Sequence, residues 1–131
     1  MPQILIVEDD EDNREILSEF LTEEGYDVAC ASNAADAIAL AVDLRPALIL
    51  MDLQMPDSGD SRAVNDEAGL AAARVLRCHP TTIGIPIVAL SGYSPTMVET
   101  SIKAAGFTAF ASKPFDFSEL ANLLATLLES S

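Results

Sequence analysis

Apolar positions cluster along this chain in short blocks that have the length of β-strands. Most of the blocks are apolar at successive rather than alternating positions, so both faces of each strand are expected to be buried. Strands of this kind are typical of a parallel sheet with helices packed on its two sides. The five predicted strands are residues 3–7, 27–31, 47–51, 85–90 and 107–111.

Each predicted strand is followed by a segment in which apolar residues recur with the 3.6-residue period of a helix. In the first of these segments Leu17 and Leu21 share one face, and Gly25 can end the helix. The five predicted helices are residues 12–25, 33–44, 67–77, 94–106 and 116–129.

Several helix starts are marked by residues whose side chains accept hydrogen bonds from backbone N–H groups. Asp12 has capping-box spacing to Glu15, and Asn33 and Asp116 stand at the starts of the second and last helices. The spacing therefore predicts Asp12 as the cap of the first helix and leaves Asp10 facing solvent.

The strict alternation of strand and helix predicts an α/β fold with a doubly wound, five-stranded parallel sheet. In such a fold, right-handed crossovers bring the carboxyl ends of all strands to one rim, and ligands bind there. The length of 131 residues suits one domain. We therefore expect a single domain over residues 1–131.

The chain is strongly acidic, with a net charge of −14 from 21 Asp and Glu residues against 7 Lys and Arg residues. This balance argues against direct binding of nucleic acid and permits a metal ion and a basic partner surface. Neither a signal peptide nor a membrane-spanning apolar run is visible. Cys30 and Cys78 lack metal-ligand spacing, so we expect free thiols in a cytoplasmic protein without a membrane partner. His79, the single histidine, is expected to be a loop residue.

Candidate chemistry collects at the ends of the predicted strands. Glu8 and Asp9 follow the first strand and Asp52 follows the third, and these two strands are commonly neighbours in doubly wound sheets. Carboxylates about 4 Å apart repel by roughly 4 kcal/mol at an effective dielectric near 20. Protonation or a bound cation relieves this repulsion, and hard oxygen ligands at an open rim suit Mg²⁺. With Ser91 and Lys113 at the ends of the fourth and fifth strands, the rim predicts a site for a phosphoryl group.

Four motifs at these strand ends are "LIVEDD" at 5–10, "ILMDLQMP" at 49–56, "IVALSGY" at 87–93 and "FASKPF" at 110–115. Together and in this order, they resemble the receiver domain of two-component response regulators over nearly the whole chain. The resemblance implies a flavodoxin-like sheet in the strand order 2-1-3-4-5. It also implies a signalling module that catalyses its own phosphorylation and dephosphorylation, rather than an enzyme acting on other substrates.

The same resemblance implies roles for individual residues. Asp52 looks like the phosphate acceptor, with a phosphohistidine on a histidine kinase or phosphotransfer protein as the donor. Asp9 looks like a direct Mg²⁺ ligand, and Glu8 like a ligand that acts through water. The backbone carbonyl of Gln54 would complete the metal site, in which Asp52 also takes part.

The resemblance further implies how a phosphoryl group at the rim would be sensed. Ser91 stands where the family has its Ser or Thr switch, and Lys113 stands where the family has its lysine. Phe110 stands where many members carry Tyr. A signal through an aromatic hydroxyl is therefore not expected there, whereas a rotation of the Phe110 ring is. The output partner, whose identity stays open, is expected on the face formed by the last two predicted helices and the strand between them.

The function of one long segment and the extent of the whole protein stay open. The polar segment at 57–66 is longer than the family usually shows, and is either a tolerated surface insertion or a partner-specific or gating element. No effector domain is expected after the last predicted helix, so the chain is either a stand-alone regulator or a receiver of a longer protein.

Two other functions are alternatives to the receiver. An aspartate-nucleophile phosphatase typically needs a second Asp two residues after the nucleophile, and Gln54 occupies that position. A flavodoxin-like cofactor-binding module needs a phosphate-cradling loop after the first strand. Glu8 and Asp9 stand there instead, and their charge would repel a phosphate that lacks a metal ion.

Overall fold

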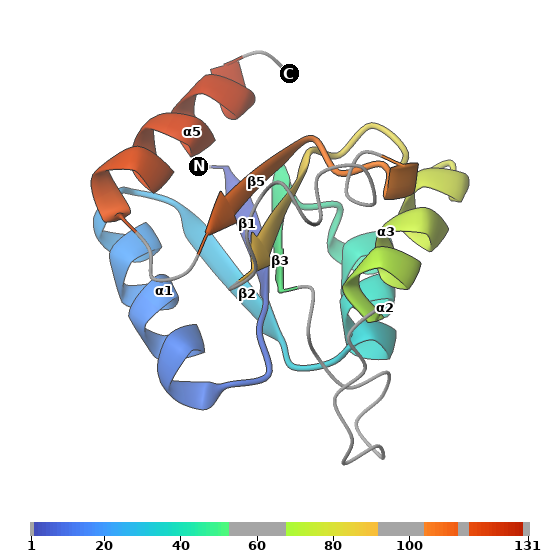
Figure 1. Ribbon diagram of the computed structural model, residues 1–131, viewed down its shortest axis with the longest axis horizontal. Helices are drawn as coiled ribbons and strands as arrows, with labels where there is room; N and C mark the ends of the chain where they lie inside the picture. The colour runs from blue at the N-terminus through green and yellow to red at the C-terminus, as the bar shows by residue number, and fades with distance from the viewer. Residues whose placement is uncertain (1, 53–67, 92–103, 113–115, 130–131) are drawn as a thin grey trace.

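The computed structural model describes residues 2–52, 68–91, 104–112 and 116–129 of the chain. Over these ranges a five-stranded sheet carries helices on both of its faces (Figure 1). The strands are β1 (Gln3–Val7), β2 (Asp27–Ala31), β3 (Leu48–Asp52), β4 (Ile87–Ser91) and β5 (Ala109–Ser112). The helices are α1 (Glu11–Glu23), α2 (Ala34–Leu44), α3 (Ala68–Cys78) and α5 (Phe117–Glu129).

The strand order is β2-β1-β3-β4-β5, and all neighbouring strands run parallel. The predicted α/β fold and the order 2-1-3-4-5 are therefore confirmed. Val7 of β1 lies opposite Met51 of β3, and Asp52 lies opposite Leu90 of β4. The carboxyl ends of these three strands thus meet at one edge of the sheet, which we call the carboxyl edge.

The sheet separates two apolar clusters, and alternate residues of each strand enter different clusters. Leu5 and Val7 pack in the cluster shared with α2 and α3, whereas Ile4 and Ile6 pack in the cluster shared with α1 and α5. All four side chains are fully buried. The two-residue period of a strand explains this division, and burial on both faces explains why the strands read as continuous apolar blocks.

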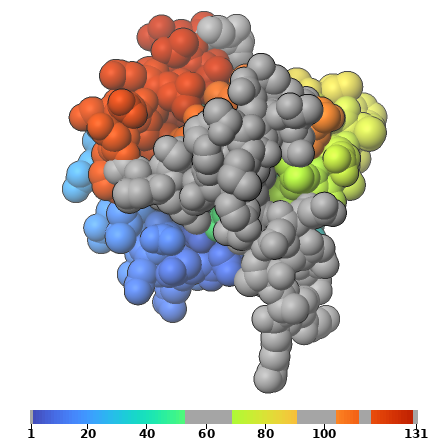
Figure 2. Space-filling model, viewed as in Figure 1, coloured from blue at the N-terminus to red at the C-terminus, as the bar shows by residue number. Residues whose placement is uncertain are grey.

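The helices on the two faces pack with side chains of different size. Ala37 and Ala41 of α2 and Ala72 of α3 are small residues in the first cluster, and these two helices pack against each other. On the other face the rings of Phe20 and Phe117 lie 4.8 Å apart and join α1 to α5. Figures 1 and 2 show α1 and α5 on one flank of the molecule and α3 on the other. None of the described helices combines the length and apolar content that a membrane crossing needs.

The start of α1 differs from the prediction. Asp10 is the N-cap, and its Oδ1 accepts hydrogen bonds from the backbone N–H groups of Asp12 at 2.9 Å and Asn13 at 3.4 Å. Asp12 is already inside the first turn, so its predicted capping role is wrong. The spacing rule identified a residue of the right type, but the loop after β1 is short enough for the helix to begin earlier. Asp10 is exposed, as predicted.

The capping predictions for Asn33 and Asp116 are confirmed. The side chain of Asn33 accepts a hydrogen bond from the Asp36 N–H at 2.9 Å. Asp116 Oδ1 accepts from the N–H groups of Ser118 at 3.0 Å and Glu119 at 3.2 Å. These bonds satisfy donors that have no partner within the first helical turn.

Strands β4 and β5 begin two residues later than predicted, because burial extends beyond the hydrogen-bonded ladder. Ile85 and Phe107 are buried, yet both precede their strands. Pro86 also lacks the N–H group that a ladder uses. An apolar pattern indicates burial rather than hydrogen bonding. It therefore overestimates the length of a strand wherever a buried side chain belongs to the preceding loop.

Candidate functional site

Three carboxylates meet at the carboxyl edge because β1 and β3 are neighbours. Val7 and Met51 are paired, so the residues that follow them, Glu8 and Asp52, emerge side by side. Carboxylate oxygens of Glu8, Asp9 and Asp52 all lie within 4.8 Å of one another. We call these three residues the acidic cluster.

The members of the acidic cluster differ in their access to solvent. Glu8 and Asp52 are 1% and 3% exposed, whereas Asp9 is accessible. Burial costs a carboxylate much of its hydration, and a second carboxylate nearby raises that cost. The cluster therefore favours a bound cation, with Asp9 on the open side.

The loop that carries Glu8 and Asp9 is held at several points. The Glu8 N–H donates to the carbonyl oxygen of Ala31 in β2 at 3.0 Å, which continues the sheet by one bond. The Asp10 N–H donates to Glu8 Oε1 at 3.3 Å. Arg14 of α1 donates from Nη1 to the carbonyl oxygens of Glu8 at 2.9 Å and Asp9 at 3.5 Å. The sequence pattern does not identify Arg14, because its partners here are backbone carbonyl oxygens, which every residue possesses.

The donor set of the acidic cluster fits Mg²⁺. This ion takes hard oxygen ligands, keeps several of its waters and is bound through few carboxylates. Asp9 and Asp52 offer such oxygens at the carboxyl edge, and Glu8 adds negative charge beside them. The cluster has no His or Cys member, which distinguishes it from the nitrogen and sulfur sets that zinc prefers.

The remaining predicted site residues are placed only in part. Ser91 is the last residue of β4 and follows Leu90, the partner of Asp52. Phe110 of β5 pairs with Ala89 and is partly buried against the cluster shared with α2 and α3. Three predictions lie outside the described residues, namely Gln54, Lys113 and the segment 57–66, as does most of the predicted helix 94–106.

The structure also describes the two cysteines and the single histidine. Cys30 and Cys78 are free and exposed. His79 follows α3, and its Nδ1 accepts a hydrogen bond from the Thr81 N–H at 3.1 Å. This bond shapes the turn after the helix, so His79 has a local structural function.

Comparison with known proteins identifies relatives over nearly the whole chain. Residues 4–125 match the family model described as the response regulator receiver domain. The chain is 33% identical over 120 residues to the regulatory protein AtoC of Escherichia coli, covering 90% of this chain and 23% of that protein. It is 31% identical over 115 residues to the polar-differentiation response regulator DivK of Brucella anthropi, covering 87% of this chain and 86% of DivK.

A solved structure with the same fold carries a magnesium ion. The receiver domain of a sensor histidine kinase from Pseudomonas aeruginosa has a TM-score of 0.85 and 26% sequence identity, and the match covers 98% of both chains. That structure has a magnesium ion coordinated in its active-site cleft. Since the family model, the curated relatives and the strand order all agree, this chain belongs to the response regulator receiver domain family.

Proposed function

We propose that this receiver accepts a phosphoryl group on Asp52 from a phosphohistidine of a histidine kinase or phosphotransfer protein, in a reaction that requires Mg²⁺. The observation that carries the proposal is the convergence of the Asp52 carboxylate with those of Glu8 and Asp9. Asp52 is the only member of the cluster on β3, and it ends that strand at the centre of the sheet.

Asp52 acts as the nucleophile in the proposed transfer. One of its carboxylate oxygens attacks phosphorus, so a new O–P bond forms while the N–P bond of the phosphohistidine breaks. The imidazole nitrogen keeps the electron pair of the broken bond, and the product on Asp52 is a mixed anhydride. Water later attacks the phosphorus, which returns the carboxylate and releases inorganic phosphate.

Glu8 and Asp9 supply the charge that a metal ion needs at this edge. Asp9 is the accessible carboxylate and is proposed as a direct ligand together with Asp52 and the carbonyl oxygen of Gln54. Glu8 is buried and already accepts the Asp10 N–H, so it is proposed to act through a water molecule. Bound Mg²⁺ supplies positive charge that offsets the negative charge of the phosphoryl oxygens.

Ser91, Lys113 and Phe110 are proposed to transmit the phosphorylated state. The Ser91 hydroxyl donates to a phosphoryl oxygen, in a charge-assisted hydrogen bond of about 1.5–3 kcal/mol. The Lys113 ammonium pairs with the same group, and the Phe110 ring moves into space that the Ser91 movement opens. The affected face comprises the predicted helix 94–106, β5 and α5, and is the proposed surface for an output partner.

Intact mass after treatment with acetyl phosphate and Mg²⁺ tests the acceptor. The wild-type chain is expected to gain one phosphoryl group, and Asp52→Asn is expected to gain none. Asp43→Asn is the matched control, because Asp43 is an exposed aspartate on α2 away from the cluster. A mass gain that persists in Asp52→Asn, or that persists after chelation of the metal, contradicts the assignment.

A further inference from the structure

Arg14 reaches backward from α1 to the loop that carries two members of the acidic cluster. It is the fourth residue of the helix, and helical Cα–Cβ bonds tilt toward the N-terminus, so its side chain extends over the preceding loop. Its Nη1 lies 2.9 Å from the carbonyl oxygen of Glu8 and 3.5 Å from that of Asp9. Both of these hydrogen bonds go to backbone rather than to a carboxylate.

These two carbonyl groups flank the Cα atom of Asp9. The Glu8 carbonyl belongs to the peptide plane before the Asp9 Cα atom, and the Asp9 carbonyl belongs to the plane after it. A single guanidinium therefore restrains the planes on both sides of one Cα atom, and those planes set the direction of its Cα–Cβ bond. Asp9 is also the least buried member of the cluster.

We propose that Arg14 is a positioning residue of the metal site, which directs the Asp9 carboxylate toward Glu8 and Asp52. The inference rests on the proposed function, since it assumes that the acidic cluster binds Mg²⁺. Arg14 touches neither the metal nor the phosphoryl group in this role. It acts through the backbone of the two residues whose carbonyl oxygens it holds.

The charge of Arg14 and its hydrogen bonds have opposite effects on metal affinity. A guanidinium near a divalent cation repels it, so loss of the charge alone makes Mg²⁺ binding tighter. Loss of the two hydrogen bonds frees the Asp9 backbone, so Mg²⁺ binding becomes weaker because the ligand must be ordered on binding. The sign of the change therefore separates positioning from simple electrostatics.

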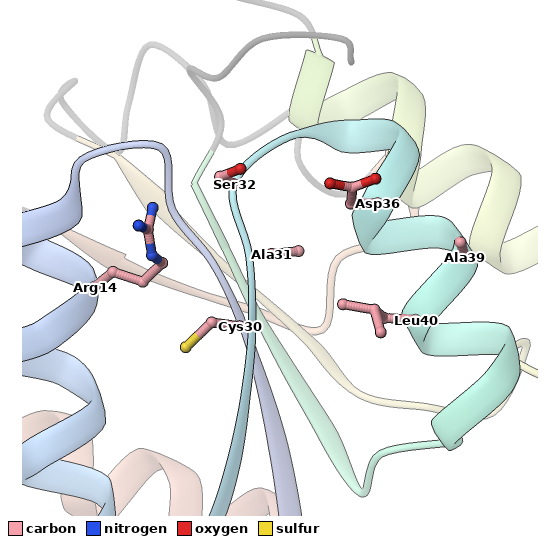
Figure 3. A pocket seen from close by; sticks show the side chains of 7 residues that line it. All are labelled: Arg14, Cys30, Ala31, Ser32, Asp36, Ala39 and Leu40. Atoms are coloured by element: carbon pink, nitrogen blue, oxygen red, sulfur yellow. The ribbon is translucent and has the colours of Figure 1, made fainter. Parts of the chain in front are cut away.

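Arg14 can be replaced without opening the core. Its side chain borders a groove between α1, β2 and α2, together with Cys30, Ser32 and Asp36 (Figure 3). Arg14 is a member of neither apolar cluster. Arg14→Met keeps an unbranched side chain in the groove while it removes the donors, so the variant is expected to fold.

Calorimetric titration with Mg²⁺ alone tests the proposal on the full chain. Arg14→Met is expected to bind Mg²⁺ more weakly by on the order of tenfold, the scale of a lost charge-assisted hydrogen bond. Arg45→Met is the control, because it removes an exposed positive charge at the far end of α2 and is expected to change affinity by less than about twofold. Affinity in Arg14→Met that equals or exceeds that of the wild type overturns the proposal.

Arg14→Lys adds a test that keeps the charge. An ammonium is a point donor that cannot reproduce the reach of a guanidinium, so affinity is expected to fall between wild type and Arg14→Met. If Arg14→Met fails to fold, wild-type affinity in Arg14→Lys still overturns the positioning role. Failure of the proposed function has a different signature, in which the wild type does not bind Mg²⁺ or Asp52→Asn binds it equally well.

Discussion

Arg77 of α3 and Gly106, which are 29 residues apart in the chain, are in direct contact before β5. The Arg77 Nε donates a 2.7 Å hydrogen bond to the Gly106 carbonyl oxygen, and a Cβ atom on Gly106 would lie 2.5 Å from Arg77 Cγ. The same guanidinium donates from Nη1 to the carbonyl oxygens of Ile83 at 3.0 Å and Ile85 at 2.7 Å, and from Nη2 to Thr108 Oγ1 at 3.3 Å. Partial burial lowers the pKa of Arg77 through desolvation. One side chain thus joins the segments that lead into β4 and β5, opposite the carboxyl edge.

Gly106→Ala is expected to destabilise the domain more than Gly25→Ala. Both glycines have φ of 96°, a conformation that costs a residue with a side chain roughly 1–2 kcal/mol. Only Gly106 also has Arg77 in the space that the new methyl group needs, and overpacking adds about 1–3 kcal/mol. Urea unfolding of the two variants gives the comparison, and equal losses of unfolding free energy would show that Arg77 moves aside without cost.

Arg77→Lys is expected to lower the free energy of unfolding by about 2 kcal/mol, even though it keeps the positive charge. The ammonium group of lysine cannot donate to oxygens on both segments at once, so partly buried carbonyl oxygens lose their donors. Arg74→Lys, three residues earlier on the exposed side of α3, is the matched control and should change stability by less than about 0.5 kcal/mol. A similar small effect for Arg77→Lys would mean that charge alone accounts for its contribution.

The N-cap of α1 predicts different losses of unfolding free energy for substitutions of Asp10 and Asp12. Asp10→Ala should lower the unfolding free energy by about 1 kcal/mol, because the N–H groups of Asp12 and Asn13 lose their acceptor. Asp12→Ala removes an equal charge from the first turn without removing the cap, so the loss should be a few tenths of a kcal/mol. Chemical unfolding in metal-free buffer gives both values, and a larger loss for Asp12→Ala would contradict the cap seen here.

The strands and helices could be predicted from the sequence because the positions of apolar residues along the chain match the positions that are buried in the fold. Strands covered on both faces read as continuous apolar blocks, and their alternation with helical periodicity leaves few topologies. Glu8, Asp9 and Asp52 could be placed together for the same reason. Each follows or ends a strand, so topology alone brings them to one edge.

Arg14 and Arg77 could not be predicted in the same way. Their partners are mainly backbone carbonyl oxygens, which every residue possesses and which therefore leave no mark in the sequence. The direction of a long side chain also depends on where neighbouring segments come to lie, as for Gly106 beside Arg77. Interactions of this type emerge only after the elements have been assembled.

Asp9→Asn is expected to be more stable than the wild type without metal and less stable than the wild type with Mg²⁺. Without metal, the variant removes one of three converging carboxylates, so its free energy of unfolding should rise by about 1 kcal/mol or more. With Mg²⁺, the wild type is stabilised by RT ln(1 + [Mg²⁺]/Kd), about 2.7 kcal/mol when the ion is at a hundred times its Kd. The variant loses a ligand and gains little, so the wild type becomes the more stable protein.

Thermal unfolding with a chelator and then with Mg²⁺ checks this reversal. Asp27→Asn is the control, because it removes the same charge from an exposed position at the start of β2, at the opposite edge of the sheet. Its midpoint should shift equally in both buffers, since it lies far from any ion bound at the cluster. A lower midpoint for Asp9→Asn in the chelator would show that repulsion among the three carboxylates is already relieved without a metal. An equal response of Asp9→Asn and the wild type to Mg²⁺ would remove Asp9 from the metal site.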